Sequence, residues 1–257
     1  MSIIYGPVPS WRLGRSLGID MVSTRLKTCS FDCVYCQLGD TVNKQTDRKE
    51  FVSLKHLEHE LNLLPPLDMD YATFSGVGEP TLAINIGDAI EMVRQSLRIP
   101  IAVLTNSSLL HKRDVRQDLA HADIVIAKLD APEDDLLHLI NRPVFDCSLS
   151  EITDGIKSFR SMFRGKLAIQ MMFMEANREK APALAEIVRQ FSPDELQINT
   201  PLRPCPVRPL SPADISQIIR SFSGFRHVIT VYEAPKPSIE PVNRQQTERR
   251  RPEVQQI

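Results

Sequence analysis

The sequence has no long apolar run, no large excess of charge of either sign and no recognisable secretion signal. Because no apolar run approaches the ~20 residues of a membrane-spanning helix, we expect no membrane association. The formal net charge of −1 gives no overall basic field for nucleic acid, although a local basic patch could be hidden in a balanced total. Since the first residues lack a basic region, an apolar core and a cleavage site, we expect a cytoplasmic protein.

Cysteine is scarce, with five residues in 257, and three of these, Cys29, Cys33 and Cys36, lie within eight residues. This distribution does not suit a disulfide framework in a reducing compartment, whereas it suits a metal site. The paired C-x2-C knuckles of common zinc sites are absent. With 42% hydrophobic and 25% charged residues, the chain can build an ordinary globular core of one domain or two.

Short apolar runs alternate with amphipathic segments from about residue 18 onward, which is typical of βα units and a parallel sheet. We therefore expect an α/β fold, a partial (β/α)6 TIM-like barrel with parallel strands. The expected strands are Gly18–Ser23, Tyr71–Ser75, Ile101–Thr105, Ile124–Lys128, Leu167–Met172 and Leu196–Asn199, with His227–Tyr232 as an additional candidate. The expected helices are Leu54–Leu64, Ile86–Leu97, Leu149–Phe163, Ala181–Phe191 and Pro212–Phe222, with Ser53 and Ser211 as N-caps.

The composition divides the chain into three expected regions. Residues 1–17 form an N-terminal extension, in which Trp11 and Arg12 are candidates to close the barrel floor. Residues 18–234 form the barrel. Residues 235–257, rich in Pro, Gln, Arg and Glu, are expected to form a flexible tail.

In a sheet of parallel strands, the loops after the carboxyl ends of the strands carry the chemistry. The polar and Gly/Pro-rich segments of this sequence fall after expected strands. They are the cysteine segment and residues 76–80, 106–108, 130–132 and 200–204. We therefore expect these segments to meet at one rim of the barrel.

The segment KTCSFDCVYCQ spaces its cysteines as C-x3-C-x2-C, which is compact enough for one loop to bind a single cofactor with three thiolates. On a four-iron cluster, three thiolates leave one iron open to an external molecule. Two alternatives remain open. One is a structural zinc site completed by Cys147, Cys205 or a histidine, and the other is a ferredoxin-type electron carrier. The spacing favours the open-iron cluster.

With Tyr35 as the aromatic residue before the last cysteine, this motif resembles that of the radical S-adenosylmethionine (SAM) superfamily. The resemblance implies that Cys29, Cys33 and Cys36 bind a [4Fe–4S] cluster whose open iron chelates the amino and carboxylate groups of SAM. An electron from a reductant such as flavodoxin or ferredoxin would cleave SAM to methionine and a 5′-deoxyadenosyl radical, which abstracts hydrogen from a substrate. The resemblance therefore implies an enzyme.

The same resemblance assigns the turn in FSGVGEPTL to the SAM amino group and Asp130 to a ribose contact. The residues of this turn are Gly76, Gly78, Glu79 and Pro80. From residue type alone, Thr105 and Asn106 could contact a ribose or substrate or could be ordinary turn residues. Gln170 and Asn199 are expected to point into the barrel.

Two basic residues are candidates for a catalytic role. Lys128 ends an apolar strand, where an ammonium is costly to bury unless it is paired or contacts a ligand. Arg142 follows a short helical segment and could clamp a carboxylate or phosphate, or could be solvated.

A longer series of motifs, from YGPVPSWRLGRSLGID to INTPLRP over residues 5 to 204, resembles the wyosine-synthetase-related group. Members that make wyosine-type bases condense pyruvate with N1-methylguanosine in transfer RNA. They carry a second cluster on three further cysteines, whereas this chain has only Cys147 and Cys205. A Schiff-base lysine is not assigned among Lys27, Lys44 and Lys128.

The substrate therefore stays open between a small molecule and an RNA base, as does the oligomeric state. A transfer-RNA-modifying enzyme of wyosine-synthase type and a non-catalytic zinc or iron–sulfur protein are the alternatives. Arg203, Arg208 and Arg249–Arg251 could contact phosphates, but arginines beside glutamate in a tail are usually solvated.

Overall fold

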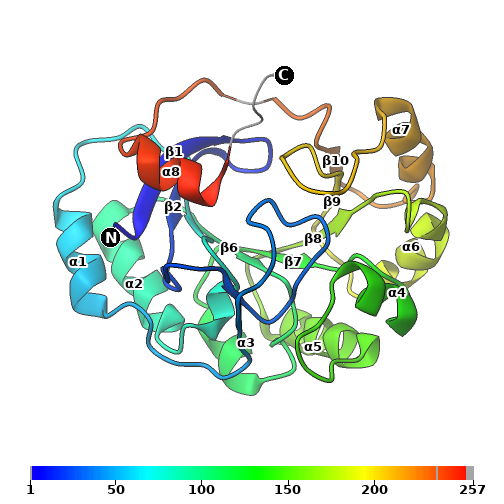
Figure 1. Ribbon diagram of the computed structural model, residues 1–257, viewed down its shortest axis with the longest axis horizontal. Coiled ribbons are helices and arrows are strands. Elements are labelled where there is room, and N and C mark those ends of the chain that lie inside the picture. Colours follow the sequence, from blue (N-terminus) through cyan, green and yellow to red (C-terminus); the bar gives the residue numbers. More distant parts are fainter. Residues whose placement is uncertain (1, 236, 253–257) are drawn as a thin grey trace.

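The computed structural model describes residues 2–235 and 237–252. Its main sheet contains β1 (Ile4–Ser10), β2 (Gly14–Ile19), β5 (Tyr71–Phe74), β6 (Ile101–Thr105), β7 (Ile124–Lys128), β8 (Lys166–Met172), β9 (Glu195–Asn199) and β10 (Val228–Thr230). The strands lie in this order, and all neighbours pair in parallel except β1 and β2. The sheet curls, and β1 and β10 form its edges (Figure 1). The expected partial α/β barrel is confirmed.

Helices cover the convex face of the sheet (Figure 1). They are α1 (Leu54–Asn62), α2 (Ile86–Leu97), α3 (Arg113–Leu119), α4 (Asp134–Ile140), α5 (Leu149–Met162), α6 (Ala181–Arg189) and α7 (Pro212–Arg220). Helix α2 shows why they pack there, because Ile86, Ala89, Ile90 and Val93 form one apolar stripe and are all fully buried. The expected caps are present, with Ser53 and Ser211 accepting hydrogen bonds from the first turns of α1 and α7. None of the helices within residues 2–235 and 237–252 has the length and hydrophobicity of a transmembrane segment.

The N-terminal region is a β-hairpin rather than an extension that precedes a first strand at Gly18–Ser23. β1 pairs antiparallel with β2, which ends at Ile19. Pro7 and Pro9 conceal β1 in the sequence because proline lacks the N–H that a central strand donates. As β1 is an edge strand, proline is tolerated there. The turn between β1 and β2, with Trp11 and Arg12, lies where the parallel strands begin, which is the floor of the barrel.

The expectation of a flexible tail over residues 235–257 is wrong for α8 (Arg244–Arg250), which packs beside β1 (Figure 1). Asn243 caps this helix, and Thr247 accepts a hydrogen bond of 2.9 Å from the Gly6 amide. Arg250 is 1% exposed, so the arginines of the tail are not all solvated. Residues 236 and 253–257 lie outside the described residues.

The Arg250 guanidinium explains why a polar helix docks here. Its Nε donates a hydrogen bond of 2.7 Å to Asp20, directly after β2, and its Nη2 donates to the Ser2 carbonyl at 3.0 Å and to Ser23 Oγ at 2.7 Å. Because Asp20 is 2% exposed, both charges are removed from water and satisfy each other. The tail is thereby fastened to the start of the cysteine segment.

Acid is expected to weaken a second ion pair, the one between Arg15 in β2 and Asp70, the residue before β5. Arg15 donates hydrogen bonds to Asp70 from its backbone N at 2.7 Å, its Nε at 3.1 Å and its Nη2 at 2.7 Å, and these lower the pKa of Asp70 from 3.8 to about 2. Because the folded pKa is the lower one, the ion pair stabilises the fold above pH 4 and is lost as the pH falls toward 2. Asp70→Asn should therefore flatten the fall of the melting temperature between pH 4 and pH 2.

The matched control is Asp154→Asn, which removes an exposed carboxylate on α5. It should leave the pH dependence of the melting temperature unchanged. An Asp70→Asn protein with the acid response of the wild type would contradict the assignment.

Candidate active site

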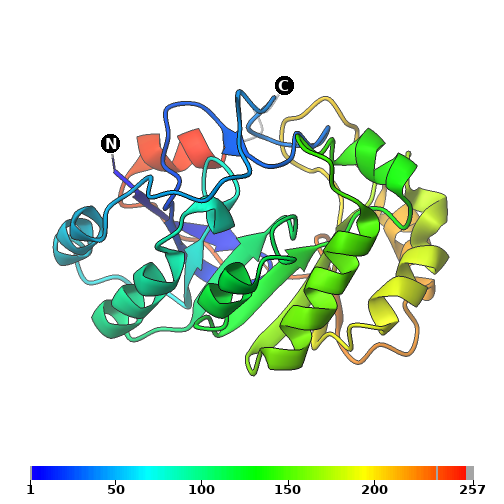
Figure 2. The ribbon, with the colours of Figure 1, turned by 90° about the horizontal axis from the view of Figure 1, so that it is seen from below.

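A cavity of about 540 Å³ lies inside the curled sheet, with lining residues from β1, β2 and β5 to β9. It brings together most of the side chains that the sequence analysis selects. These are Cys29, Tyr35, Cys36, Gly76, Gly78, Glu79, Thr105, Asn106, Lys128, Gln170 and Asn199. Cys33, Pro80, Asp130 and Arg142 do not line it. The cysteine segment and α8 lie along the same edge of the molecule (Figure 2).

Backbone hydrogen bonds hold the cysteine segment on both sides. On one side, Thr28 N donates to the Val77 carbonyl at 3.2 Å, and Glu79 N donates to the Thr28 carbonyl at 3.3 Å. On the other, Val34 N donates to the carbonyl of Ile140, the last residue of α4, at 2.9 Å. A short parallel pair, β3 (Thr28–Cys29) with β4 (Asn43–Lys44), closes the base of the loop. The backbone path of the cysteine segment is therefore set before any cofactor binds.

Two asparagines donate to cysteine sulfurs. The distance from Asn106 Nδ2 to Cys29 Sγ is 3.6 Å, and that from Asn141 Nδ2 to Cys33 Sγ is 3.5 Å. The three thiols form no disulfide, and burial raises the pKa of Cys33 to about 11 and that of Cys29 further. Within the described ranges, no three His, Cys, Asp or Glu residues are gathered to hold a metal ion. Because their pKa values are raised, the thiols of Cys29 and Cys33 are neutral in the absence of a metal. They become thiolates when a metal displaces the proton.

The turn after β5 has two close packing contacts. A Cβ on Gly78 would collide with the carbonyl oxygen of Thr28, and a Cβ on Gly76 would collide with the carboxylate of Asp20. Both glycines line the cavity, but the requirement for glycine comes from the protein itself. The turn is thus the surface against which the cysteine segment and Asp20 pack.

Replacing Gly78 by alanine is expected to displace Thr28 and with it the neighbouring Cys29. The overpacking should cost about 1–3 kcal/mol of unfolding free energy, because the obstructing atom is backbone that cannot rotate away. The iron bound after anaerobic reconstitution should fall as well. Thermal melting and iron analysis check both effects.

Gly224→Ala is the control for this prediction. Gly224 has φ of 94°, but no atom lies within 4 Å of a Cβ placed on it. In that variant, the free energy of unfolding should fall only by the amount that an alanine loses at a positive φ. The variant should bind as much iron as the wild type. Equal iron content in the Gly78→Ala protein would show that the contact does not position Cys29.

Glu79 is 2% exposed and accepts four hydrogen bonds. Its Oε1 accepts from Thr81 N and Oγ1 and from Thr105 Oγ1, at 3.2, 2.7 and 2.7 Å. Its Oε2 accepts from Asn106 N alone, at 2.7 Å, which leaves this oxygen with spare acceptor capacity. Burial is the largest influence on Glu79 and raises the pKa of its carboxyl.

The carboxylate of Asp130, which the superfamily resemblance assigns to a ribose contact, accepts hydrogen bonds from three residues of the protein. Its Oδ2 accepts from Tyr35 OH and from Asn141 Nδ2, the latter at 2.8 Å, and its Oδ1 accepts from Met172 N at 2.8 Å. Lys128 Nζ lies 3.4 Å from Oδ1 and 5.0 Å from the centre of the Tyr35 ring. Asp130 does not line the cavity, and the ribose contact that the resemblance implies stays a prediction. In this structure its carboxylate contacts Tyr35 and Lys128.

Of the two catalytic candidates, the structure brings only Lys128 to the cavity. Arg142 is exposed and does not line it. Gln170 and Asn199 do reach the cavity from β8 and β9, and Gln170 Nε2 is a buried donor without a partner. Pro80 begins a short 3-10 helix at Pro80–Leu82 instead of contacting the cavity.

Sequence reasoning does not select several residues of this site. Asn141 contacts a cysteine sulfur, although it is far from the cysteines in the chain. Arg12 and Arg251 line the cavity from the two ends of the chain. The sequence offers Arg12 for the barrel floor and Arg251 as a possible phosphate contact, but it does not bring the two together. No local sequence signal reports such convergence, because it depends on the hairpin and on the docking of α8.

A family model described as the Radical SAM superfamily matches residues 24–187, more than half of the chain. UPF0026 protein MJ1312 of Methanocaldococcus jannaschii is 39% identical over 236 residues, which is 89% of this chain and 73% of that protein. UPF0026 protein slr1464 of Synechocystis sp. is 40% identical over 206 residues, which is 80% of this chain and 77% of that protein.

Solved structures show the same fold at low identity. Streptococcus suis SuiB matches with a TM-score of 0.64 and 14% identity over 85% of this chain, which spans about half of SuiB (49%). The protein anSMEcpe with bound AdoMet matches with a TM-score of 0.61 and 16% identity over 84% of this chain and 64% of that one. TYW1 with a lysine-pyruvate adduct bound matches with a TM-score of 0.60 and 13% identity, over 81% and 72%.

The superfamily resemblance of the cysteine motif is therefore confirmed by an independent match over the barrel. The family implies SAM and an iron–sulfur cluster as cofactors. The chain belongs to the Radical SAM superfamily and, within it, to the UPF0026 proteins, and it is a radical SAM enzyme.

Proposed function

We propose that this enzyme binds a [4Fe–4S] cluster through Cys29, Cys33 and Cys36 and accepts electrons from a small redox protein such as flavodoxin or ferredoxin. When bound, the cluster supplies the electron that cleaves SAM reductively and starts radical chemistry on a substrate. The observation that carries the proposal is that one loop presents three unpaired thiols, two of which line a cavity that extends across the sheet.

The donor set fits this cofactor. Thiolates are the preferred ligands of iron–sulfur clusters, and three of them leave one iron for SAM. The amides of Asn106 and Asn141 lie close to two of the sulfurs, where hydrogen bonds stabilise the negative charge of thiolates and raise a cluster's reduction potential. Cys147 and Cys205 lie in other segments of the chain, between α4 and α5 and after β9, and Cys205 Sγ donates to the Val207 carbonyl at 3.3 Å.

SAM is expected to lie along the turn of Gly76 and Gly78, beside Cys29. Among the described residues that line the cavity, Glu79 is the sole carboxylate. Its Oε2 accepts only one hydrogen bond, so it can accept another from the SAM ammonium group. Thr105 orients Glu79 by a hydrogen bond from its Oγ1, and Asn106 does so by a hydrogen bond from its backbone N. Both residues also line the cavity.

Anaerobic reconstitution tests the proposal. The protein should bind about four irons and four sulfides per chain and release 5′-deoxyadenosine from SAM when dithionite is added. Stoichiometric zinc without sulfide in protein purified without oxygen would favour a zinc site instead. A loaded cluster that yields no 5′-deoxyadenosine and no calorimetric SAM binding would leave only an electron-transfer role.

A further inference from the structure

The cavity has an excess of positive charge. Among the described residues that line it, five have basic side chains, Arg12, Lys128, Arg203, Arg250 and Arg251, and one has a carboxylate, Glu79. The chain as a whole has a net charge of −1, so this excess is local. A concave surface with one predominant sign of charge attracts ligands of the opposite sign.

Two of the five cations already have carboxylate partners behind the cavity wall. Lys128 lies 3.4 Å from Asp130, and Arg250 lies 2.7 Å from Asp20. Neither of these carboxylates lines the cavity. Of the other three arginines, Arg12 and Arg251 have no carboxylate partner within residues 2–235 and 237–252, and Arg203 donates from Nη1 to the Pro252 carbonyl at 3.4 Å. These three arginines supply the remaining positive charge at the cavity.

Arg12 is the most informative of these arginines. Its guanidinium makes no hydrogen bond or ion pair with any residue in the described ranges, and its Nε is fully buried without a partner. Its position is nevertheless fixed, because the guanidinium lies 5.2 Å from the centre of the Trp11 ring. A buried, oriented and unsatisfied donor of this kind costs free energy in the empty enzyme.

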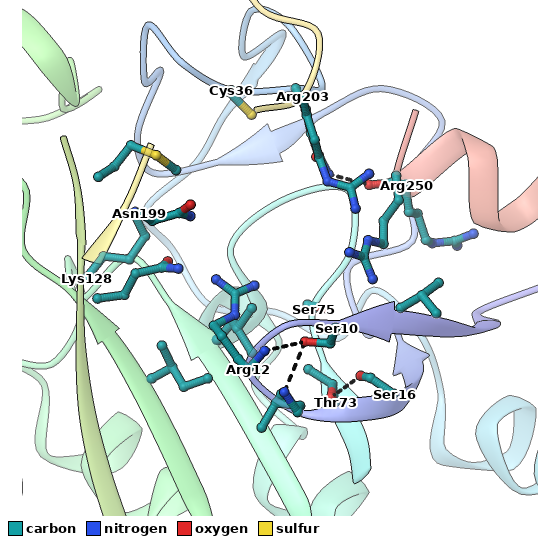
Figure 3. Close-up of a pocket in the computed structure, with 18 of the residues that line it drawn as sticks. Ser10, Arg12, Ser16, Cys36, Thr73, Ser75, Lys128, Asn199, Arg203 and Arg250 are labelled. Carbon is teal, nitrogen blue, oxygen red and sulfur yellow. Dashed lines mark hydrogen bonds between the residues drawn. The ribbon is translucent and has the colours of Figure 1, made fainter. Parts of the chain in front are cut away.

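The other two arginines face the same space from distant parts of the chain. Arg203 follows β9, and Figure 3 shows it and Arg12 extending into the cavity from opposite sides. Arg251 follows α8 and contacts no carboxylate within residues 2–235 and 237–252; its Nη2 lies 3.4 Å from the Pro9 carbonyl. Burial, followed by repulsion from Arg203, lowers the pKa of Arg12 to about 10 and that of Arg251 to about 9. At neutral pH these arginines stay charged and repel one another.

Gln170 adds a neutral donor. Its Nε2 is buried without a partner, and the residue lines the same cavity from β8. Arg12 and Gln170 therefore each place at the cavity wall a side chain with a donor that the protein leaves unsatisfied. An oxyanion supplies both the charge and the acceptors.

We infer that the substrate carries an oxyanion, either a phosphate or a carboxylate, and that Arg12, Arg203 and Arg251 bind this group. The inference rests on the proposed function, since it assigns a substrate class to the same cavity. Guanidinium groups bind such oxyanions with two parallel hydrogen bonds. A volume of about 540 Å³ is typical of small-molecule sites, and the burial of the Arg12 Nε suits a small molecule rather than an RNA backbone.

The test uses the reconstituted protein with inorganic phosphate or succinate as the probe, titrated by calorimetry at constant ionic strength. Saturable binding of one of the two is expected, and the one that binds identifies the oxyanion. Arg12→Gln and, separately, Arg251→Gln should weaken it by about tenfold or more, the effect of losing a charge-assisted hydrogen bond. Arg208→Gln, at an exposed position that does not line the cavity, should bind like the wild type.

Iron content and melting temperature show that each variant is folded and loaded. Four results would overturn the inference. They are no saturable binding of either anion, equal binding by all variants, competition between the anion and SAM, and tight binding of a short RNA that depends on Arg208. Release of 5′-deoxyadenosine by the wild type in the same preparation tests the proposed function separately, so that either claim can fail while the other stands.

Discussion

Changing any one of Cys29, Cys33 and Cys36 to serine is expected to abolish reductive cleavage of SAM. A serine hydroxyl is a harder and far less acidic ligand than a thiol, and two thiolates do not suffice to retain a four-iron cluster. The iron content after reconstitution should fall from about four per chain to less than about one. Iron and sulfide analysis, the visible absorption spectrum and 5′-deoxyadenosine release measure the loss.

Cys205→Ser is the matched control. Cys205 is half-buried, follows β9 rather than lying in the cysteine loop, and donates from Sγ to the Val207 carbonyl, so the variant should keep its iron and its activity. Before reconstitution, the three site variants should melt close to the wild-type apoprotein, because backbone hydrogen bonds rather than the thiols hold the loop. Loss of iron in Cys205→Ser, or full cleavage activity in any site variant, would contradict the assignment.

The central sheet is predictable from the sequence because its strands are buried on both faces. The expected strand Ile101–Thr105 agrees with β6 and Ile124–Lys128 agrees with β7, since parallel strands between helices are continuous apolar runs. The two ends of the chain are not predictable in this way. β1 contains two prolines, and α8 has the sequence RQQTERR, which has no apolar face. What holds α8 in place is a charge pair, which periodicity does not report.

The residues of the candidate site also fall into two groups, those that local sequence motifs identify and those that only the complete fold brings together. The cysteine loop and the Gly76–Glu79 turn are local motifs, so the spacing of the cysteines and the superfamily resemblance that follows from it select both. Asp130 follows its strand as expected, but the direction of its side chain depends on Tyr35 and Asn141, which a pattern of residues does not describe. Arg12 and Arg251 are separated by more than 200 positions, and only the complete fold brings them to one cavity.

Replacing Arg250 by alanine is expected to lower the free energy of unfolding by about 3–5 kcal/mol, because it leaves the buried carboxylate of Asp20 without its cationic partner. Burial already raises the pKa of Asp20 above 3.8, and the loss of Arg250 removes the largest influence that opposes this rise, leaving the backbone N–H groups of Val77 and Val22. The folded variant therefore binds more protons than the unfolded chain. Its stability deficit should be small near pH 4 and should grow as the pH rises toward 7.

Arg244→Ala is the control on the same helix. Its side chain is 79% exposed and pairs with Glu248, so its loss should change the free energy of unfolding by less than about 0.5 kcal/mol. Urea unfolding at several pH values measures both variants. If Arg250→Ala were no less stable than Arg244→Ala, the ion pair would not be what fastens α8.

The double variant Asp20→Asn/Arg250→Met distinguishes two causes of the lost stability. One is the loss of the attraction between Arg250 and Asp20, and the other is the burial of the Asp20 carboxylate without a cationic partner. Removing both charges leaves no buried ion without a partner, so the double variant should recover part of the stability that Arg250→Ala loses. It should also lose the pH dependence of the deficit, because Asp20 is the group that titrates. Since Asp20 packs directly against Gly76, Arg250→Ala should in addition weaken calorimetric SAM binding. The expected coupling between the tail and the SAM turn follows from this single carboxylate, which contacts both.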